Sequence, residues 1–158
     1  MIHLAQIGKF RLFSVFSRVC IPKAVFREVC IEGRPGEKEL RGAGNIETLE
    51  ISGKNIERIK GKVKNYRLGE GEFQALCLCD ELGKNIFLTD DLEAREAGKR
   101  LGFEVHGSMG IVVRAYKNGS LDLAAAKRAL DDLYRISKLF VARAIVEKAM
   151  EELERFRF

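Results

Sequence analysis

Acidic side chains occur at three points where the sequence enters a helical pattern. Asp90 and Asp91 follow a short apolar run (IFLT) and open a helix. Glu72 lies in the first turn of the most regular helical pattern, and Glu28 lies one turn into a helix that begins at Pro22. The carboxyl ends of strands in an open parallel sheet meet at one edge, so these acids could converge there. Such a cluster would bind Mg²⁺ or Mn²⁺ and support phosphodiester cleavage, because hard cations prefer oxygen ligands.

Each acid also has a structural explanation when it is taken alone. An Asp at the start of a helix is an ordinary N-cap, as Asp90 or Asp91 could be. A Glu in the first turn complements the helix dipole, as Glu72 would, and Glu28 by itself is a surface acid. Without a cation, clustered carboxylates repel one another and raise one another's pKa. The metal site is therefore a hypothesis that depends on the acids meeting in space.

The elements that must position these acids alternate between strands and helices. The spacing of apolar residues predicts strands over 19–21, 46–51, 85–89 and 103–105. It predicts helices over 2–7, 12–16, 22–33, 54–65, 70–82, 91–101, 108–116, 120–135 and 137–156. Ser120 and Ser137 are the expected N-caps of the last two helices, and residues 33–45 are the most loop-like stretch. The pattern predicts an α/β fold with a mostly parallel sheet flanked by helices and a C-terminal helical extension.

Length and composition bound the class of protein. The chain has 158 residues, 46% of them hydrophobic and 32% charged, which is typical of one globular domain. We expect a single domain over 1–158, with an α/β core over 1–121 and helices over 122–158. No apolar run is long enough for a transmembrane helix, so no membrane partner is expected. Residues 1–27 contain five basic residues and no acid, yet their apolar pattern continues into the fold, and we interpret them as part of it.

The net charge of +5 is unevenly distributed. Residues 1–65 carry 13 Lys/Arg against 7 Asp/Glu, whereas residues 66–121 carry 7 against 9. A basic flank beside an acidic middle is typical of a protein that holds a cation and meets phosphates, although two ordinary solvated surfaces would look the same. The residues that could contact RNA are Arg58, Lys60, Lys62, Lys64 and Tyr66, the last by stacking on a base. A solvated helix end is the alternative.

The four cysteines do not have the spacing of a zinc site. Cys77 and Cys79 form a C-x-C inside an apolar helical run, and the only histidines are His3 and His106. Buried free thiols in a reducing cytoplasm are the expected state. A disulfide between Cys20 and Cys30 is the alternative if the source is a hyperthermophile.

The stretch from Leu68 to Ser120 resembles the PIN-domain family, and more narrowly a PIN-like branch of unknown function. The resemblance rests on Gly71-Glu72 at a helix start, on a strand that ends in Asp90-Asp91, and on Gly107-Ser108 before the next helix. Arg95 matches an Arg in the turn after the paired acids, and IPKAVFREV resembles an upstream segment that contains Glu28. The resemblance weakens over 33–65 and 122–158.

The resemblance implies a metal-dependent endoribonuclease that cleaves single-stranded RNA with Mg²⁺ or Mn²⁺. Glu28, Glu72 and Asp91 would then be catalytic metal ligands, with Asp90 as a further candidate, and Arg95 and Ser108 would orient the site. Many members are VapC-type toxins that an antitoxin protein inhibits, and dimers are common. A cytoplasmic homodimer is expected on this basis.

One departure from the family concerns the first strand. The family begins with a strand that ends in an Asp, whereas MIHLAQIG aligns with the helix that follows it. Three explanations stay open: a start further upstream, a gap filled by another segment or a second chain through strand addition, or a degenerate member. In the last case the chain would bind RNA or a protein partner without cutting. A nucleotide-binding α/β domain is disfavoured because no Gly-rich phosphate loop follows a strand.

Overall fold

The computed structural model describes residues 1–137 and 139–156. The first part of the chain forms α1 (Ile2–Gln6), a 3₁₀ helix η1 (Phe10–Val15), β1 (Val19–Pro22), α2 (Lys23–Val29), α3 (Glu37–Gly42), β2 (Ile46–Leu49) and α4 (Gly53–Val63). The second part forms α5 (Glu70–Glu81), β3 (Ile86–Leu88), α6 (Leu92–Arg100), β4 (Glu104–His106), α7 (Ser108–Lys117), α8 (Leu123–Arg135) and α9 (Arg143–Arg155).

The mixed α/β fold with parallel pairing is confirmed, but the strands form two separate sheets. β1 pairs in parallel with β2, with Cys20 opposite Glu47. β3 pairs in parallel with β4, with Phe87 opposite Val105. Within the described residues, no strand joins β1 to β3. In the part of the chain that the structure describes, the single sheet expected from the sequence is therefore divided into two pairs of strands.

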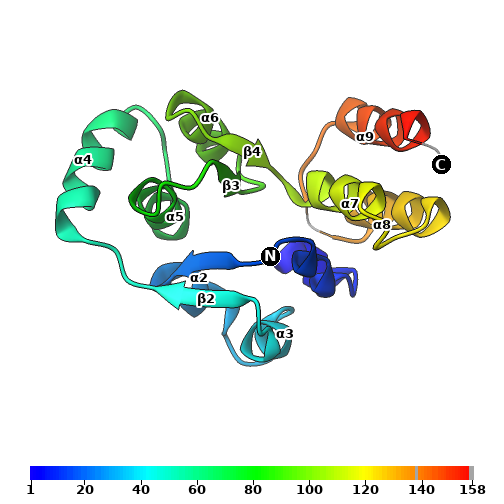
Figure 1. Ribbon diagram of the computed structural model, residues 1–158, viewed down its shortest axis with the longest axis horizontal. Coiled ribbons are helices and arrows are strands. Elements are labelled where there is room, and N and C mark those ends of the chain that lie inside the picture. The colour runs from blue at the N-terminus through cyan, green and yellow to red at the C-terminus, as the bar shows by residue number, and fades with distance from the viewer. Residues whose placement is uncertain (138, 157–158) are drawn as a thin grey trace.

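Two apolar clusters lie on opposite sides of the strands (Figure 1). The larger one packs α7, α8 and α9 with α1, η1 and β1, and its fully buried residues include Leu4, Val112, Leu130 and Leu133. The smaller one packs α4, α5 and α6 against Phe87, with Ile59, Leu76 and Cys77 buried completely. The helices thus cover both faces of the strands, in agreement with the flanking helices that the sequence predicts.

Most helix boundaries follow local signals, and the last two differ from the prediction. α8 begins at Leu123, because the Asp122 carboxylate accepts the backbone N–H of Ala125 at 2.6 Å and is the N-cap in place of Ser120. The expected helix over 137–156 begins only at Arg143. Ser137 is buried, and its hydroxyl donates to the Leu133 carbonyl at 2.7 Å, so it ends α8 rather than starting α9. The part of this prediction that concerns residue 138 lies outside the described residues.

The early boundaries shift less. Pro22 is the last residue of β1 and the N-cap of α2, and α2 ends at Val29 instead of near Gly33. The loop-like stretch contains the one short helix α3. No helix among the described residues is both long enough and apolar enough to cross a bilayer.

Candidate functional site

Glu28 and Glu72 meet at the amino end of α5. The helices α2 and α5 are in contact, and the carboxylate of Glu28 lies on the backbone of Gly71. A Cβ atom on Gly71 would come within 2.7 Å of both carboxylate oxygens of Glu28. The backbone N–H of Gly71 donates a hydrogen bond to Glu28. The family-like Gly71-Glu72 pair therefore gives Glu28 a close backbone approach and an acidic neighbour.

The electrostatic environment of Glu28 is unfavourable for its charged form. Burial of the carboxylate raises the pKa of Glu28 most, the negative charges of Glu72 and Glu70 raise it further, and only the Gly71 N–H lowers it. The side-chain charges that act on the Glu28 carboxylate are thus negative, from Glu72 and Glu70. A bound cation would remove the repulsion and stabilise both ionised carboxylates.

The carboxylate of Glu72 lies beside Gly69, the N-cap residue of α5. A Cβ atom on Gly69 would lie 2.4 Å from a carboxylate oxygen of Glu72. Two residues before Gly71, this second glycine leaves room for the second carboxylate. No sequence pattern indicated a role for Gly69 or for the lack of a side chain at Gly71.

Asp90 is held at the start of α7. It accepts the backbone N–H of Ser108 at 2.7 Å and the Ser108 hydroxyl at 2.5 Å. Arg95 donates from Nη1 to the Thr89 carbonyl at 3.3 Å, and both Arg95 and Asp90 lie beside Gly107. Ser108 and Arg95 are therefore in positions that fit the orienting roles implied by the resemblance.

Asp91 lies next to Asp90 in the chain but has a different environment. Its carboxylate accepts the Ala94 N–H at 2.8 Å and is the N-cap of α6. The side chain is exposed. Its geometry is that of an ordinary helix cap, and the same carboxylate retains a solvent-facing side.

The four acids are not assembled into one compact group. Within the described residues, no set of three or more His, Cys, Asp or Glu side chains is arranged to hold a metal ion. Of the convergence that the sequence suggested, the structure shows a Glu28–Glu72 pair at α5, while Asp91 caps α6 and Asp90 is bonded to Ser108. This pair is compatible with Mg²⁺, which takes one or two protein carboxylates and keeps several water ligands.

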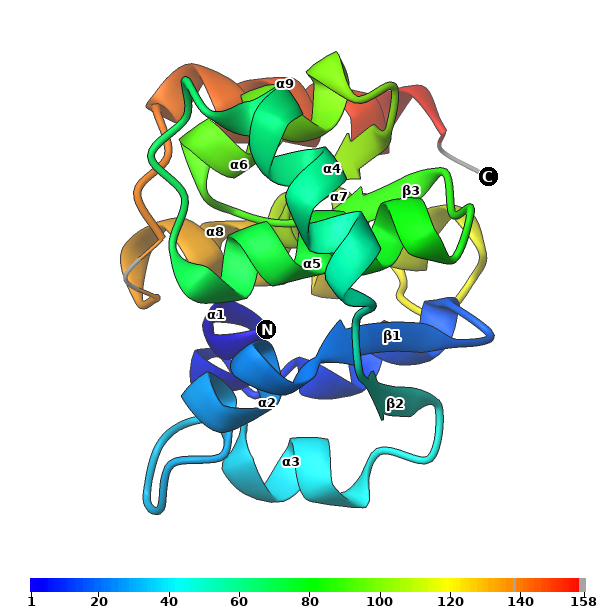
Figure 2. The same cartoon turned by 90° about the vertical axis from the view of Figure 1, so that its left-hand side faces the viewer.

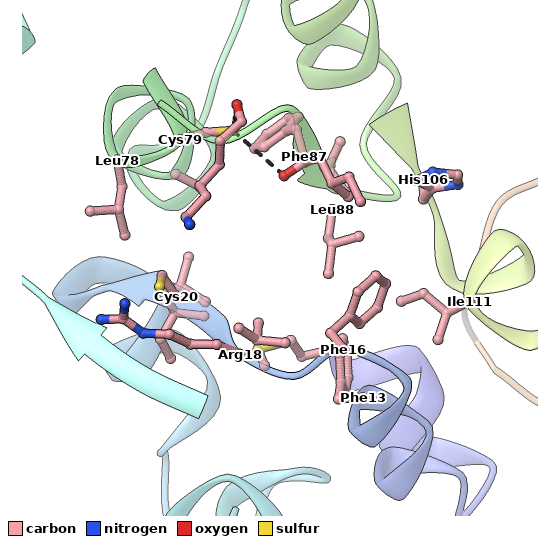
Figure 3. Close-up of a pocket in the computed structure, with 18 of the residues that line it drawn as sticks. Phe13, Phe16, Arg18, Cys20, Leu78, Cys79, Phe87, Leu88, His106 and Ile111 are labelled. Atoms are coloured by element: carbon pink, nitrogen blue, oxygen red, sulfur yellow. Dashed lines mark hydrogen bonds between the residues drawn. The ribbon is translucent and has the colours of Figure 1, made fainter. Parts of the chain in front are cut away.

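The amine of Met1 is a feature that no sequence signal indicated. It is buried close to Asp90, and burial lowers its pKa while the negative charge of Asp90 raises it. Met1 also lines a cavity of about 650 Å³ that lies between β1 and β3. We call this cavity the channel; Figure 3 shows it between α5 and β3 on one side and β1 and η1 on the other.

The basic residues lie on and around α4. Arg58 donates to Asn55 and forms an ion pair with Asp80, so its guanidinium is bound within the fold. Lys60, Lys62 and Lys64 are exposed. Tyr66 is half-buried and packs against the smaller apolar cluster, which leaves only part of its ring for stacking.

The cysteines are free thiols. Cys77 and Cys79 are buried, and burial raises the pKa of each to about 11. The half-buried Cys20 and Cys30 are not bonded to each other, so the alternative disulfide is absent.

The chain matches a family model described as a PIN domain over residues 1–155. Because this match covers almost the whole chain, the protein belongs to the PIN-domain family. No curated protein and no solved structure matches it. Family membership indicates a nuclease-type protein in general terms, and the finer function has to be argued from the site.

Proposed function

We propose that this chain is a Mg²⁺- or Mn²⁺-dependent endoribonuclease that acts on single-stranded RNA. The observation that carries the proposal is the Glu28–Glu72 pair: Glu28 is exposed as a residue, but its carboxylate is partly desolvated and has the negative charges of Glu72 and Glu70 beside it. Two neighbouring carboxylates repel each other and so do not stabilise the folded chain by themselves. A bound cation would remove this repulsion, and carboxylates arranged in this way are common at functional sites. Membership of the PIN-domain family supports the nuclease class.

In this proposal Glu28 and Glu72 hold the ion, and Asp91 and Asp90, which the structure does not join to that pair, are the further acids that the family resemblance implies. When bound, a divalent ion can activate water and stabilise charge on a phosphodiester. Gly71 fixes the Glu28 carboxylate through its N–H, and Ser108 fixes Asp90 through two hydrogen bonds. Arg95 ties the start of α6 to the end of β3 through the Thr89 carbonyl.

RNA binding would use the exposed lysines of α4. Lys60, Lys62 and Lys64 can neutralise phosphates, since contacts of this kind supply most of the non-specific affinity for nucleic acid. The ion pair of Arg58 with Asp80 makes it a weaker candidate than the lysines. The partial burial of Tyr66 leaves only part of its side chain able to contact RNA.

A degenerate member that binds RNA or a protein partner without cutting is the second candidate. The observation that favours it is the scatter of the acids, because no metal-binding group of three or more was found among residues 1–137 and 139–156. Asp91 is engaged as the N-cap of α6, and Asp90 accepts two hydrogen bonds from Ser108 at the start of α7. A toxin inhibited by an antitoxin protein is compatible with either candidate.

Cleavage of a labelled single-stranded RNA by the purified chain tests the first candidate. We expect cleavage in Mn²⁺, none with excess chelator, and none in the combined variant Glu72→Gln with Asp91→Asn. The control is Glu57→Gln on the exposed face of α4, which should cleave normally. Cleavage that survives chelation, or that the combined variant retains, would contradict the proposed site.

Metal binding can be measured without turnover. Calorimetry with Mn²⁺ should detect binding that Glu28→Gln weakens and that Glu57→Gln leaves unchanged. Binding of RNA without cleavage at saturating Mn²⁺ would favour the second candidate. Absence of Mn²⁺ binding in the parent chain would argue against a metal-dependent enzyme.

A homodimer is the quaternary state that we propose. Ile136, Phe140 and Ile145 are exposed around the connection between α8 and α9, while Leu130, Leu133 and Leu139 are buried. Several exposed apolar side chains within one short stretch of chain often mark a protein contact. Sedimentation equilibrium of the parent chain and of Phe140→Ser would show whether this patch forms the dimer.

A further inference from the structure

A surface cavity of about 360 Å³ lies where the end of α4 meets the end of α6. Lys62 and Lys64 reach it from the end of α4, and Arg100 reaches it from the last residue of α6. Asn65 and Leu101 also line it. We call it the basic cavity, and its described lining shares no residue with that of the channel.

The cationic side chains of the basic cavity have no counter-charge in the part of the chain that the structure describes. Lys62, Lys64 and Arg100 are exposed, and none of their side chains forms an ion pair or a hydrogen bond there. Lys99, the neighbour of Arg100, differs in this respect, because it pairs with Glu96. Like charges that share one cavity repel one another, and an anion bound between them would remove that repulsion.

Basic residues at the end of a helix also have an ordinary explanation. A cation in the last turn complements the helix dipole, which contributes about 0.3–1 kcal/mol. Lys60 and Lys99 already lie in the last turns of α4 and α6 and can serve this purpose. The dipole explains basic residues on each helix separately, but it does not explain why both helices direct cations to the same cavity.

The side chains of the basic cavity suit a phosphate group. The planar guanidinium of Arg100 can bind two phosphate oxygens at once, and the ammonium groups of lysines act as point charges beside them. The exposed amide of Asn65 can donate a further hydrogen bond. No acidic side chain belongs to the described lining of the cavity, so nothing there repels an anion.

The connection between α4 and α5 links the basic cavity to the acidic pair. Residues 64–69 run from the end of α4 past α6 to the start of α5 (Figure 2). The N–H of Arg67 donates to Glu93 in the first turn of α6 at 3.4 Å, so the connection lies against that helix. It ends at Gly69, beside the carboxylate of Glu72. The helix α6 has nine residues and is thus about 13 Å long, and the basic cavity lies at its far end.

We propose that the basic cavity binds a phosphate group of single-stranded RNA at a distance of several nucleotides from the Glu28–Glu72 pair. This inference rests on the proposed function, since it follows the connection from the acids to the cavity. Arg100, which no sequence pattern indicated, is then an RNA-binding residue, and it acts on the same phosphate as the two lysines. A strand that spans both sites binds more tightly than one that reaches only one of them, because the second contact is intramolecular.

RNA binding in excess chelator tests this proposal without cleavage. The probe is a labelled single-stranded RNA of about twelve nucleotides, a common length for a single-strand site. We expect Arg100→Gln to weaken binding at least fivefold and to reduce the magnitude of the slope of log K against log salt by about 0.7. The control is Lys54→Gln, which removes one charge from the exposed opposite end of α4 and should change the affinity less than twofold.

Two further measurements locate the phosphate. If Arg100 and Lys64 hold the same phosphate, the combined variant Arg100→Gln with Lys64→Gln loses less affinity than the product of the two single losses. NMR follows the Arg100 Nε–H and the Leu101 amide during titration with the RNA, with inorganic phosphate and with a hexaglutamate peptide. We expect the RNA to shift both signals at the lowest concentration.

Several results would overturn the proposal. Equal loss of affinity in Arg100→Gln and Lys54→Gln would show that RNA senses only the net charge. Larger shifts with inorganic phosphate would assign the cavity to a free anion, and larger shifts with hexaglutamate would assign it to an acidic protein segment. Absence of cleavage by the parent chain in Mn²⁺ would contradict the nuclease function, whereas a loss of binding confined to Arg100→Gln would still support the RNA site.

Discussion

The carboxylate of Glu28 lies against Gly71, where a Cβ atom would come within 2.7 Å of both its oxygens. Because these oxygens are the end of a flexible side chain, a methyl group at position 71 would move the carboxylate without disturbing the backbone. One substitution at position 71 should therefore change the metal-binding site without changing the stability of the fold.

Gly71→Ala should lower Mn²⁺ affinity and RNA cleavage at least tenfold while leaving the free energy of unfolding equal or higher. Ala favours a helix over Gly by up to about 1 kcal/mol, which offsets the small steric cost. The control is Gly61→Ala in α4, where nothing lies within 4 Å of the added atom. Urea unfolding and calorimetry measure the two effects, and normal Mn²⁺ binding by Gly71→Ala would contradict the position assigned to Glu28.

Glu28→Gln should raise the thermal midpoint at pH 7. The pKa of Glu28 is raised in the folded protein, so its stabilising contribution is complete below the ordinary carboxyl pKa and is lost as the pH rises through the folded value. The difference between parent and variant should therefore shrink towards pH 4. Saturating Mg²⁺ should stabilise the parent chain and Glu57→Gln but not Glu28→Gln, and Glu57→Gln should behave like the parent at every pH.

Ser108→Ala should destabilise the fold through the start of α7. Ser108 is 2% exposed, and its hydroxyl donates to the Asp90 carboxylate. Loss of a hydrogen bond to a charged group costs about 1.5–3 kcal/mol. Urea unfolding of Ser108→Ala and of the exposed control Ser14→Ala measures the effect, and equal stability of the two would show that the hydroxyl bond contributes nothing.

Local signals predicted the elements that contain the site, and they failed where two signals competed. α5 and β3 appear close to their expected bounds because apolar spacing and the turn at Gly83, with φ of 59°, agree. Ser120 and Asp122 are both capable N-caps, but the Ser120 hydroxyl donates to the Asn118 side chain at 2.9 Å and only Asp122 caps α8. Sequence spacing alone does not rank two such caps.

The contacts between helices and strands could not be predicted from the sequence. The pairing of Glu28 with Glu72 depends on α2 crossing α5, which no local pattern encodes. The same holds for the position of the Met1 amine beside Asp90. Asp90 and Asp91 are neighbours in the chain, yet Asp90 bonds to Ser108 at the start of α7 and Asp91 caps α6, because successive residues after a strand point in different directions.

Gly98→Ala should destabilise the packing of α6 on the second sheet. A Cβ atom at this position would lie 2.8 Å from the ring of Phe87 and 3.0 Å from Val105. Phe87 is 3% exposed and cannot move away freely, so overpacking should cost about 1–3 kcal/mol. Urea unfolding should show this loss, in contrast with the gain for Gly61→Ala, and a stability gain in both would show that α6 has room to move.

The combined variant Lys62→Gln with Lys64→Gln should weaken RNA binding in a salt-dependent way. Both lysines are exposed near the end of α4, and each phosphate contact that is lost should reduce the magnitude of the slope of log K against log salt by about 0.7. The matched control is Arg128→Gln with Lys148→Gln, which removes the same charge from α8 and α9. Filter binding to single-stranded RNA across a salt series measures both. Equal loss in the two variants would show that RNA senses only the net charge, whereas a reduced slope confined to the first would locate the phosphate contacts on α4.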